Sequence, residues 1–109
     1  MKSFIAILPF LGIALAETQA QVHMFACQEK MFTGICTNIA VNSNACYELS
    51  KLGTEWIRAI SSASPDQGAV CTLYNEEGCT GTKLKIAACG INDLKDLDFD
   101  KTAVSFKCK

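Results

Sequence analysis

Histidine, arginine and proline are scarce in this sequence, and no stretch of it is strongly basic. The 109 residues include one histidine, His23, two prolines and one arginine, Arg58, and the lysines are scattered along the chain. Because the sequence has no basic cluster, it gives no electrostatic support to binding of nucleic acid or of an anionic membrane. A single histidine and the lack of a Cys-x-x-Cys pair support zinc ligation poorly as well.

The residue patterns of catalysis are also missing. Nucleophilic catalysis needs a base beside the nucleophile, and His23 stands near the start of the expected mature chain, where chain ends are usually mobile. No glycine-rich phosphate loop is present. Paired carboxylates such as Glu76 and Glu77 can act on glycans, but in a hairpin that ends on glycine they are typical of a solvated turn. We therefore predict that the protein is not an enzyme.

The first sixteen residues have the layout of a secretory signal. A positive charge at Lys2 is followed by an uncharged, apolar stretch that closes on the small residues of Ala14-Leu15-Ala16. Spanning a bilayer takes ~20 apolar residues, more than this run or any other in the chain provides. The sequence thus predicts a signal peptide at 1–16, no membrane span, and one secreted, extracellular domain at 17–109. Losing Lys2 leaves nine basic residues against eleven acidic ones, a net charge of −2.

Cysteine, in contrast, is abundant. Seven cysteines all follow the expected cleavage point, and an exported protein enters an oxidising compartment. A domain of this size buries a modest core and often needs cross-links. We therefore predict three disulfides and one leftover thiol, with fifteen possible pairings among six cysteines. The cysteines are Cys27, Cys36, Cys46, Cys71, Cys79, Cys89 and Cys108.

Short apolar or alternating runs recur between turn residues. In the last of them Val104, Phe106 and Cys108 alternate with their neighbours, which is the period of a half-buried strand. The segment 47–60 has helix-like apolar spacing interrupted by Gly53, and we expect a loop with one helical turn before a strand. Many short strands predict an all-β sandwich or barrel. The expected strands are Val22–Ala26, Ile35–Val41, Ala69–Tyr74, Leu84–Ala88 and Ala103–Cys108.

The mature chain is also organised as two copies of one unit. The polar segment 61–68, which contains proline and glycine, predicts a linker between motif one (about 22–63) and motif two (about 69–108). Both halves contain a bulky residue or cysteine, a second one after four intervening positions, and a glycine two positions later. The two copies are Cys27-x4-Phe32-x-Gly34 and Tyr74-x4-Cys79-x-Gly81.

With these patterns the sequence resembles the βγ-crystallin superfamily, and most closely its small, cysteine-rich, secreted fungal members. In this pattern the glycine folds a hairpin over the sheet while the bulky residues pin it. The block Cys71-Thr72-Leu73-Tyr74 and the closing run 99–108 also match the fungal members. The resemblance covers essentially all of the mature chain. It implies two Greek-key motifs packed as a disulfide-stapled, βγ-crystallin-like sandwich.

The resemblance also singles out one cysteine. Cys89 stands where the family usually has proline, whereas the other six cysteines fall at family positions. Cys89 is therefore the candidate odd thiol. It is either free, or joins two copies of the chain in a dimer, or is a buried, inert side chain that fills a small apolar gap. The pairing of the other six cysteines stays open.

Many members of the superfamily bind calcium through an Asn/Asp-Asn/Asp-x-x-Ser/Thr-Ser stretch in each motif. In motif one the stretch matches 57–62, where an apolar residue and a cation replace the first two ligands. In motif two, Asp100 and Ser105 remain, but Lys101 adds a positive charge and Val104 removes a hydroxyl. Calcium needs about six or more oxygen ligands. We therefore predict a degenerate remnant of the site, and neither calcium nor another cofactor.

Export, small size, disulfides and the lack of catalytic patterns together suggest a binding function. The resemblance favours a fungal effector or elicitor that binds a host or cell-surface protein or glycan. Two alternatives follow from the same resemblance: a killer-toxin-like antimicrobial protein, and an extracellular proteinase inhibitor with the segment 61–68 as its reactive loop. A structural role in a wall or matrix is a further alternative. A net charge of −2 counts against a membrane-acting toxin, which would be cationic.

Overall fold

The computed structural model describes residues 21–109, so the expected signal peptide at 1–16 lies outside the described residues. No helix within 21–109 is long and apolar enough to cross a membrane. The strands of this part are β1 (Gln21–Glu29), β2 (Thr33–Asn42), β3 (Cys46–Glu48), β4 (Ser62–Pro65), β5 (Val70–Glu76), β6 (Thr80–Ala87) and β7 (Ser105–Cys108). Its short 3-10 helices are η3 (Lys30–Phe32), η4 (Leu49–Leu52), η5 (Thr54–Trp56) and η6 (Leu94–Leu97).

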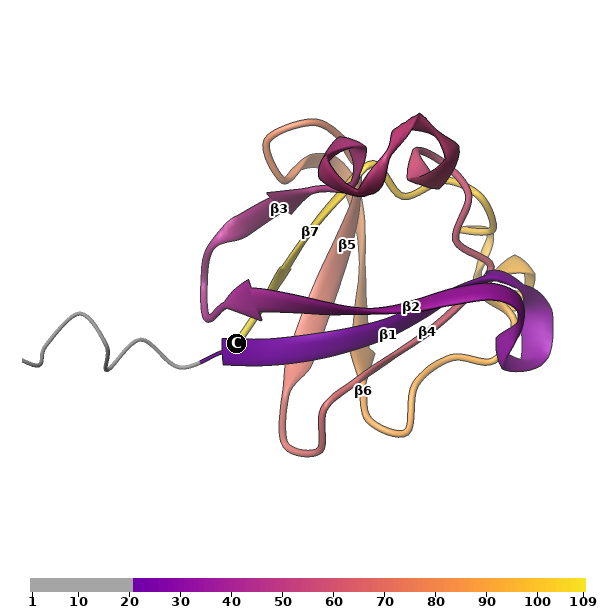
Figure 1. Ribbon diagram of the computed structural model, residues 1–109, viewed down its shortest axis with the longest axis horizontal. Helices are drawn as coiled ribbons and strands as arrows, with labels where there is room; N and C mark the ends of the chain where they lie inside the picture. Colours follow the sequence, from indigo (N-terminus) through magenta and orange to yellow (C-terminus); the bar gives the residue numbers. More distant parts are fainter. Residues whose placement is uncertain (1–20) are drawn as a thin grey trace, which may run out of the picture.

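The strands form two antiparallel sheets. Sheet A has the strand order β2-β1-β4, and sheet B has the order β3-β7-β5-β6. In Figure 1 the strands β1 and β2 run across the direction of β5, β6 and β7. The strand β3 follows β2 in the chain but pairs with β7 of the second half, with Tyr47 opposite Phe106. The first half therefore contributes strands to both sheets, as expected of a Greek key.

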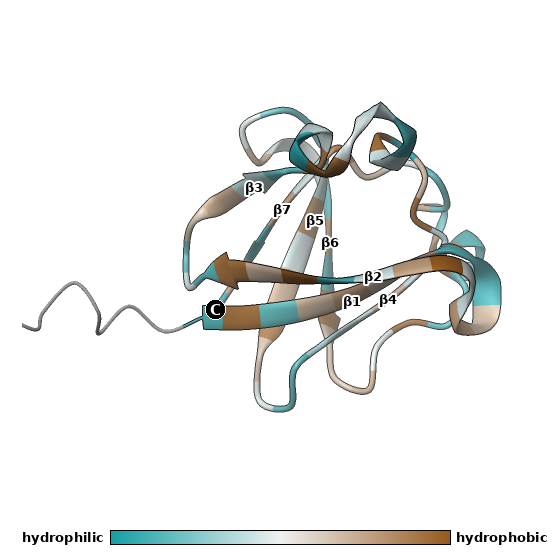
Figure 2. Ribbon diagram, viewed as in Figure 1, coloured by the Kyte–Doolittle hydropathy of each residue, from teal (hydrophilic) through white to brown (hydrophobic). Residues whose placement is uncertain are grey.

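The core lies between the two sheets. Hydrophilic and hydrophobic residues alternate at the start of β1, from Gln21 to Met24 (Figure 2), so that alternate side chains face inward. Full burial of a large apolar side chain contributes about 1.5–3 kcal/mol, which makes this layer the main source of stability. Large, fully buried side chains of the core are Met24, Leu49, Ile60, Leu73, Ile86, Leu94 and Phe106.

The second half repeats the architecture of the first. The hairpins β1–β2 and β5–β6 both carry a shift of register just before their tips, at Glu29 and at Glu76. A single bridge between Ala63 and Ile91 in sheet A takes the position that the full strand β3 has in sheet B. The predicted fold class, all-β with two Greek-key motifs forming a disulfide-stapled sandwich, is confirmed.

Each hairpin folds back over its own sheet and is held there by a buried serine. The Ser62 hydroxyl accepts a hydrogen bond from the Phe32 N–H (3.1 Å) and donates one to the Glu29 carbonyl (2.7 Å). A chain that reverses in this way leaves a backbone donor and acceptor unpaired, and one hydroxyl satisfies both. The second hairpin has the same bonds, from Cys79 N–H to Ser105 Oγ (3.0 Å) and from Ser105 Oγ to the Glu76 carbonyl (2.6 Å).

The glycine of each pattern has the conformation that the resemblance implies. Gly34 has a φ of 78° and Gly81 a φ of 85°, in the left-handed region that favours glycine. A Cβ atom at either position would collide with the side chain of Glu29 or of Glu76. These two glycines therefore allow the hairpins to fold over.

Six cysteines form three disulfides. Cys27–Cys36 joins β1 to β2, Cys46–Cys79 joins β3 to the tip of the second hairpin, and Cys71–Cys108 joins β5 to β7 inside the core. Cys89 has no disulfide partner and is exposed, which argues against the alternative of a buried, inert side chain.

The expectation of a linker at 61–68 is wrong for residues 61–65. Residues 62–65 form β4, which pairs with β1, and Ser61, Ser62 and Ala63 are buried. Only 66–68 in this segment is exposed. Small residues are required here because the first hairpin lies over Ser62 on the outer side.

The segment 47–60 does form short helical turns, η4 and η5, on either side of Gly53, ahead of β4.

Candidate functional site

Sheet B carries a basic outer face. Lys83 and Lys85 lie two positions apart on β6, and Lys107 of β7 is followed two positions later by Lys109. Side chains two positions apart in a strand share a face of the sheet. Lys85 and Lys107 both lie opposite Thr72 of the central strand β5. Four ammonium groups therefore gather over β5, and we call this surface the lysine face.

The lysine face surrounds a shallow cavity of about 260 Å³. Since neighbouring strands are ~4.8 Å apart, the backbones at Lys85 and Lys107 are separated by ~10 Å, and Lys83 and Lys85 by ~7 Å along the strand. No aspartate or glutamate lines the cavity, and none of the four lysines forms an ion pair with a carboxylate of residues 21–109. The other lining residues are Asn44, Val70, Thr72, Tyr74 and Cys108.

This face corrects the expectation that the lysines are scattered. Lys85 and Lys107 are far apart in the sequence, and the placement of β5 between β6 and β7 brings them together. Both pairs, 83/85 and 107/109, have the spacing of neighbours on one face of a strand, and this signal was present in the sequence. A net negative charge for the whole chain therefore hides a local surplus of positive charge.

Two further crevices lie where the motifs meet, and each contains a cation. In the first, of about 210 Å³, the Lys101 ammonium donates a hydrogen bond to the Gln28 carbonyl of the other motif (2.7 Å). In the second, of about 360 Å³, the Arg58 guanidinium donates to the Asn75 carbonyl (3.3 Å). The two cations have the same left-handed backbone conformation, with φ of 51° at Lys101 and 56° at Arg58. The repeat thus extends to these side chains.

The structure separates the two residues of the expected calcium remnant. Ser105 makes its hydrogen bonds with the second hairpin, whereas Asp100 lines the first crevice together with Ser61 of motif one. Each crevice is therefore built from both motifs. The calcium-binding stretch that the resemblance assigns to a single motif contains residues of two different crevices. Val104, for the same reason, lines the second crevice with Ile57.

Neither crevice fits calcium. The first is lined by three carboxylates and three ammonium groups, so its formal charges cancel, and one of the ammonium groups already occupies the Gln28 carbonyl. In the second, Ile57 and Val104 supply no side-chain oxygen, and Asn75 and Thr80 are engaged in hydrogen bonds of the hairpin, so Glu76 and Glu77 are the side-chain donors left. Calcium needs six to eight oxygen ligands. Among residues 21–109 no group of three or more His, Cys, Asp or Glu side chains is placed to hold a metal. The charged residues of the first crevice are Glu29, Asp93, Asp100, Lys30, Lys95 and Lys101.

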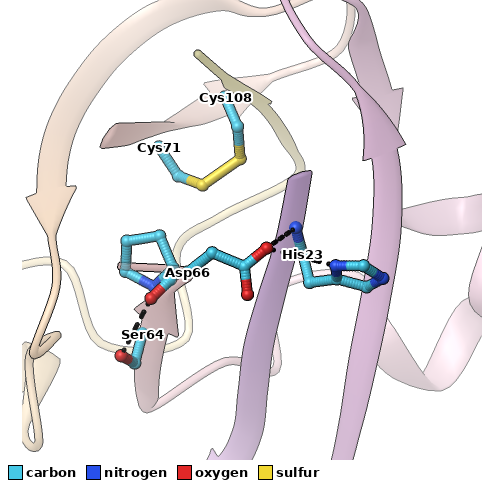
Figure 3. A network of polar contacts seen from close by, with 6 residues as sticks. His23, Ser64, Asp66, Cys71 and Cys108 are labelled. Carbon is cyan, nitrogen blue, oxygen red and sulfur yellow. Dashed lines mark hydrogen bonds and ion pairs between the residues drawn. A yellow bond between two sulfur atoms is a disulfide. The ribbon is translucent and has the colours of Figure 1, made fainter. Parts of the chain in front are cut away.

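His23 lies within β1, not in a frayed chain end, and has an acidic partner. The carboxylate of Asp66 accepts hydrogen bonds from the His23 N–H (2.8 Å) and lies 3.1 Å from Nδ1 of the ring (Figure 3). The backbone hydrogen bond, followed by the ring contact, lowers the pKa of Asp66 below 3.8. The nearby Ser64 hydroxyl donates to the Pro65 carbonyl (3.4 Å).

Exposed apolar side chains gather near the tip of the first hairpin. Met31 and Ile35 are exposed, and the ring of Phe25 stacks on that of Phe32 with centroids 6.1 Å apart. Phe32 also lines a shallow cavity of about 430 Å³ together with Cys89. A dimer through Cys89 stays a prediction, with the thiol on an accessible surface.

No protein-family model and no curated protein sequence matches the chain. Solved structures do match. A βγ-crystallin domain from Clostridium beijerinckii is 18% identical, with a TM-score of 0.67 over 79% of this chain and 95% of that one. The N-terminal domain of protein S is 18% identical, with a TM-score of 0.65 over 80% and 94%. A structure described under the evolution of the eye lens βγ-crystallin domain fold is 13% identical, with a TM-score of 0.67 over 90% and 93%.

Topology, folded hairpins and strand exchange between the halves define a double Greek-key domain. The likeness to these structures identifies its fold as that of the βγ-crystallins.

Proposed function

We propose that this protein is an extracellular, non-catalytic binding module of the effector or elicitor type, which attaches through its lysine face to an acidic glycan on a host or cell surface. The observation that carries the proposal is the gathering of four lysines around one cavity that no aspartate or glutamate lines. Unpaired ammonium groups on a flat sheet create a local positive potential that attracts a polyanion. The three disulfides support an oxidising, extracellular setting.

The composition of the lysine face favours a glycan over other polyanions. Membrane surfaces are bound by helices or patches that add exposed apolar side chains to the basic ones. The exposed large apolar residues of 21–109 all lie outside the cavity lining. The face contains no arginine, the residue that most often reads nucleic-acid bases. Tyr74 and Thr72, between the lysines, offer a ring face and a hydroxyl group to a sugar.

Binding of the oxidised protein to immobilised polygalacturonate tests this proposal. We expect binding that weakens steeply with salt, because exposed charges are screened within about 8–10 Å at physiological ionic strength. Reversing two lysines in K83E/K107E should lower the affinity about tenfold or more, since tenfold corresponds to ~1.4 kcal/mol. A neutral polysaccharide should bind neither protein.

The matched control is K30E/K51E, which changes the net charge equally but alters no residue of the cavity. Equal loss of binding in both double variants would show that only net charge matters and would overturn the proposal. Preferential binding to phosphatidylserine vesicles or to duplex DNA would assign the face to another polyanion. Growth arrest of yeast by the protein, with no glycan binding, would favour the toxin alternative.

A further inference from the structure

We infer that Lys101 and Arg58 are resident cations that join the two motifs at the positions where the family resemblance places calcium. This inference is independent of the lysine face, which lies on the outer side of sheet B and includes neither residue. The contacts of these two cations hold the two motifs together.

The two contacts are reciprocal. Lys101 belongs to motif two and binds the carbonyl of Gln28 in motif one, whereas Arg58 belongs to motif one and binds the carbonyl of Asn75 in motif two. Each carbonyl lies in the strand that enters the folded hairpin of its motif. A main-chain carbonyl is a donor that calcium also accepts as a ligand, and here an ammonium or guanidinium group supplies the positive charge beside it.

The backbone around each cation is arranged alike. The N–H of Arg58 donates to the Ala103 carbonyl (2.9 Å), and the N–H of Lys101 donates to the Ile60 carbonyl (2.9 Å). Each loop is therefore fixed to the other motif by its main chain before its side chain reaches across. The left-handed φ at both positions directs the side chains in equivalent ways. Both halves have a cation at this position, which supports an equivalent role for the two side chains.

Charge in the Lys101 crevice agrees with this assignment, whereas the Arg58 crevice has two carboxylates, Glu76 and Glu77, against one guanidinium group. In the Lys101 crevice three carboxylates are balanced by three ammonium groups, so there is no deficit for a dication to fill. Replacing Lys101 by aspartate would leave four carboxylates against two ammonium groups and would free the Gln28 carbonyl. The Ser61 hydroxyl already lines this crevice. Oxygen donors of these kinds, carboxylate, hydroxyl and carbonyl, are the ones that calcium prefers.

Thermal unfolding with excess calcium or with EDTA tests the inference. The unchanged protein should have the same Tm in both. Lys101→Met, which keeps the length of the side chain but removes its charge, should lower the Tm by about 4 °C in both, as expected for the loss of about 1 kcal/mol. Lys101→Asp should lower the Tm in EDTA and regain it in calcium, with terbium luminescence as a direct signal of binding.

The matched control is Lys51→Asp, which makes the same charge reversal at an exposed position that lines neither crevice. It should show no calcium response, because Lys51 lies outside both crevices, and Arg58→Met should lower the Tm in EDTA as Lys101→Met does, because the Asn75 carbonyl loses its donor. A Tm of the unchanged protein that rises with calcium would overturn the inference. So would an unaltered Tm of Lys101→Met, or a Lys101→Asp variant that ignores calcium. Polygalacturonate binding should be unchanged in Lys101→Met, which separates this test from that of the proposed function.

Discussion

The outer faces of the two sheets have the same register but opposite chemistry. On each face a row of three side chains crosses the hairpin and the last strand of the motif. In sheet A the row is Asn38, Phe25 and Ser64, and in sheet B it is Lys85, Thr72 and Lys107. Two positions after Ser64 and Lys107, Asp66 of the first motif corresponds to Lys109 of the second. The Asp66 N–H donates to the His23 carbonyl of β1, and the Lys109 N–H donates to the Val70 carbonyl of β5. One face is neutral or acidic and the other is basic.

The inner positions of the two halves differ far less. Ser62 and Ser105 make the same two hydrogen bonds, and the folded hairpins have glycine at the same position. Packing and hydrogen bonding thus constrain the inside and the hairpins of both copies, whereas the outer rows are free to change. We therefore expect that any binding specificity of such a duplicated fold lies in the outer positions, where the copies diverge.

The largest expected difference between the sheets concerns their disulfides. Cys71–Cys108 closes 37 residues and lies in the core, whereas Cys27–Cys36 closes nine between neighbouring strands of sheet A. The chain-entropy relation gives about 4 kcal/mol for the first and about 2.5 kcal/mol for the second. C71A/C108A should therefore lose more free energy of unfolding than C27A/C36A in urea titrations. Equal losses would mean that the halves are stabilised alike and that loop length is not decisive.

A smaller difference is expected for the serines that hold the hairpins. Ser62→Ala should cost about 1–3 kcal/mol, because it leaves a buried N–H and a carbonyl unpaired. Ser105→Ala should cost less, since the second hairpin is also held by Cys46–Cys79 and by a hydrogen bond from the Gly78 N–H to Glu48 (2.7 Å).

Chemical denaturation of both alanine variants measures this difference, with Ser50→Ala, at an exposed position, as the control. The comparison is sharpened by removing Cys46 and Cys79 from both variants, after which the two costs should converge. A larger cost for Ser105→Ala in the oxidised protein would contradict the expected order.

The smallest expected effect lies at the position where sheet A has Asp66 and sheet B has Lys109. The His23 contacts lower the pKa of Asp66 in the folded protein, so the carboxylate stabilises the fold above its unfolded-state pKa and loses this effect as pH falls through the folded value. The Tm of Asp66→Asn should therefore lie slightly below that of the unchanged protein near neutral pH. The two should converge at strongly acidic pH.

Thermal melts across an acidic pH series, with Glu77→Gln as an exposed control, check this expectation. A Tm difference that grows as the pH falls would contradict the assigned sign of the pKa shift.

Much of the fold was predictable because its signals are local. The expected strands near β1, β2, β5, β6 and β7 exist, with ends shifted by a few residues, and both glycine patterns form folded hairpins. The strand β4 was expected only as the strand that follows the helical turn in 47–60, and its residues were assigned to a linker because Ser62–Pro65 has the composition of a loop. A Cβ at Gly90 would meet the Ala63 carbonyl oxygen and the Cα and Cβ of Ser64, so glycine at position 90 allows a close approach to β4 that no local pattern reveals.

The surfaces were less predictable because they depend on pairings between distant segments. The lysine face needs β5 to separate β6 from β7, and the crevices combine Asp100 of one motif with Ser61 of the other. The alternation at 83/85 and 107/109 indicated two basic strand faces, but not that they are the same face. The partner of His23 is 43 positions away in the sequence, and nothing near the histidine indicates it.

The exchange of β3 between the halves has a consequence for resistance to proteolysis. The exposed turn at 66–68 is the connection between the halves and the natural place for a protease to cut. A chain nicked there would keep β3 paired with β7, and Cys46–Cys79 would still join the two fragments covalently. The other two disulfides each close within one fragment. The domain is thus built to survive a cut at its most accessible point as one folded, cross-linked molecule.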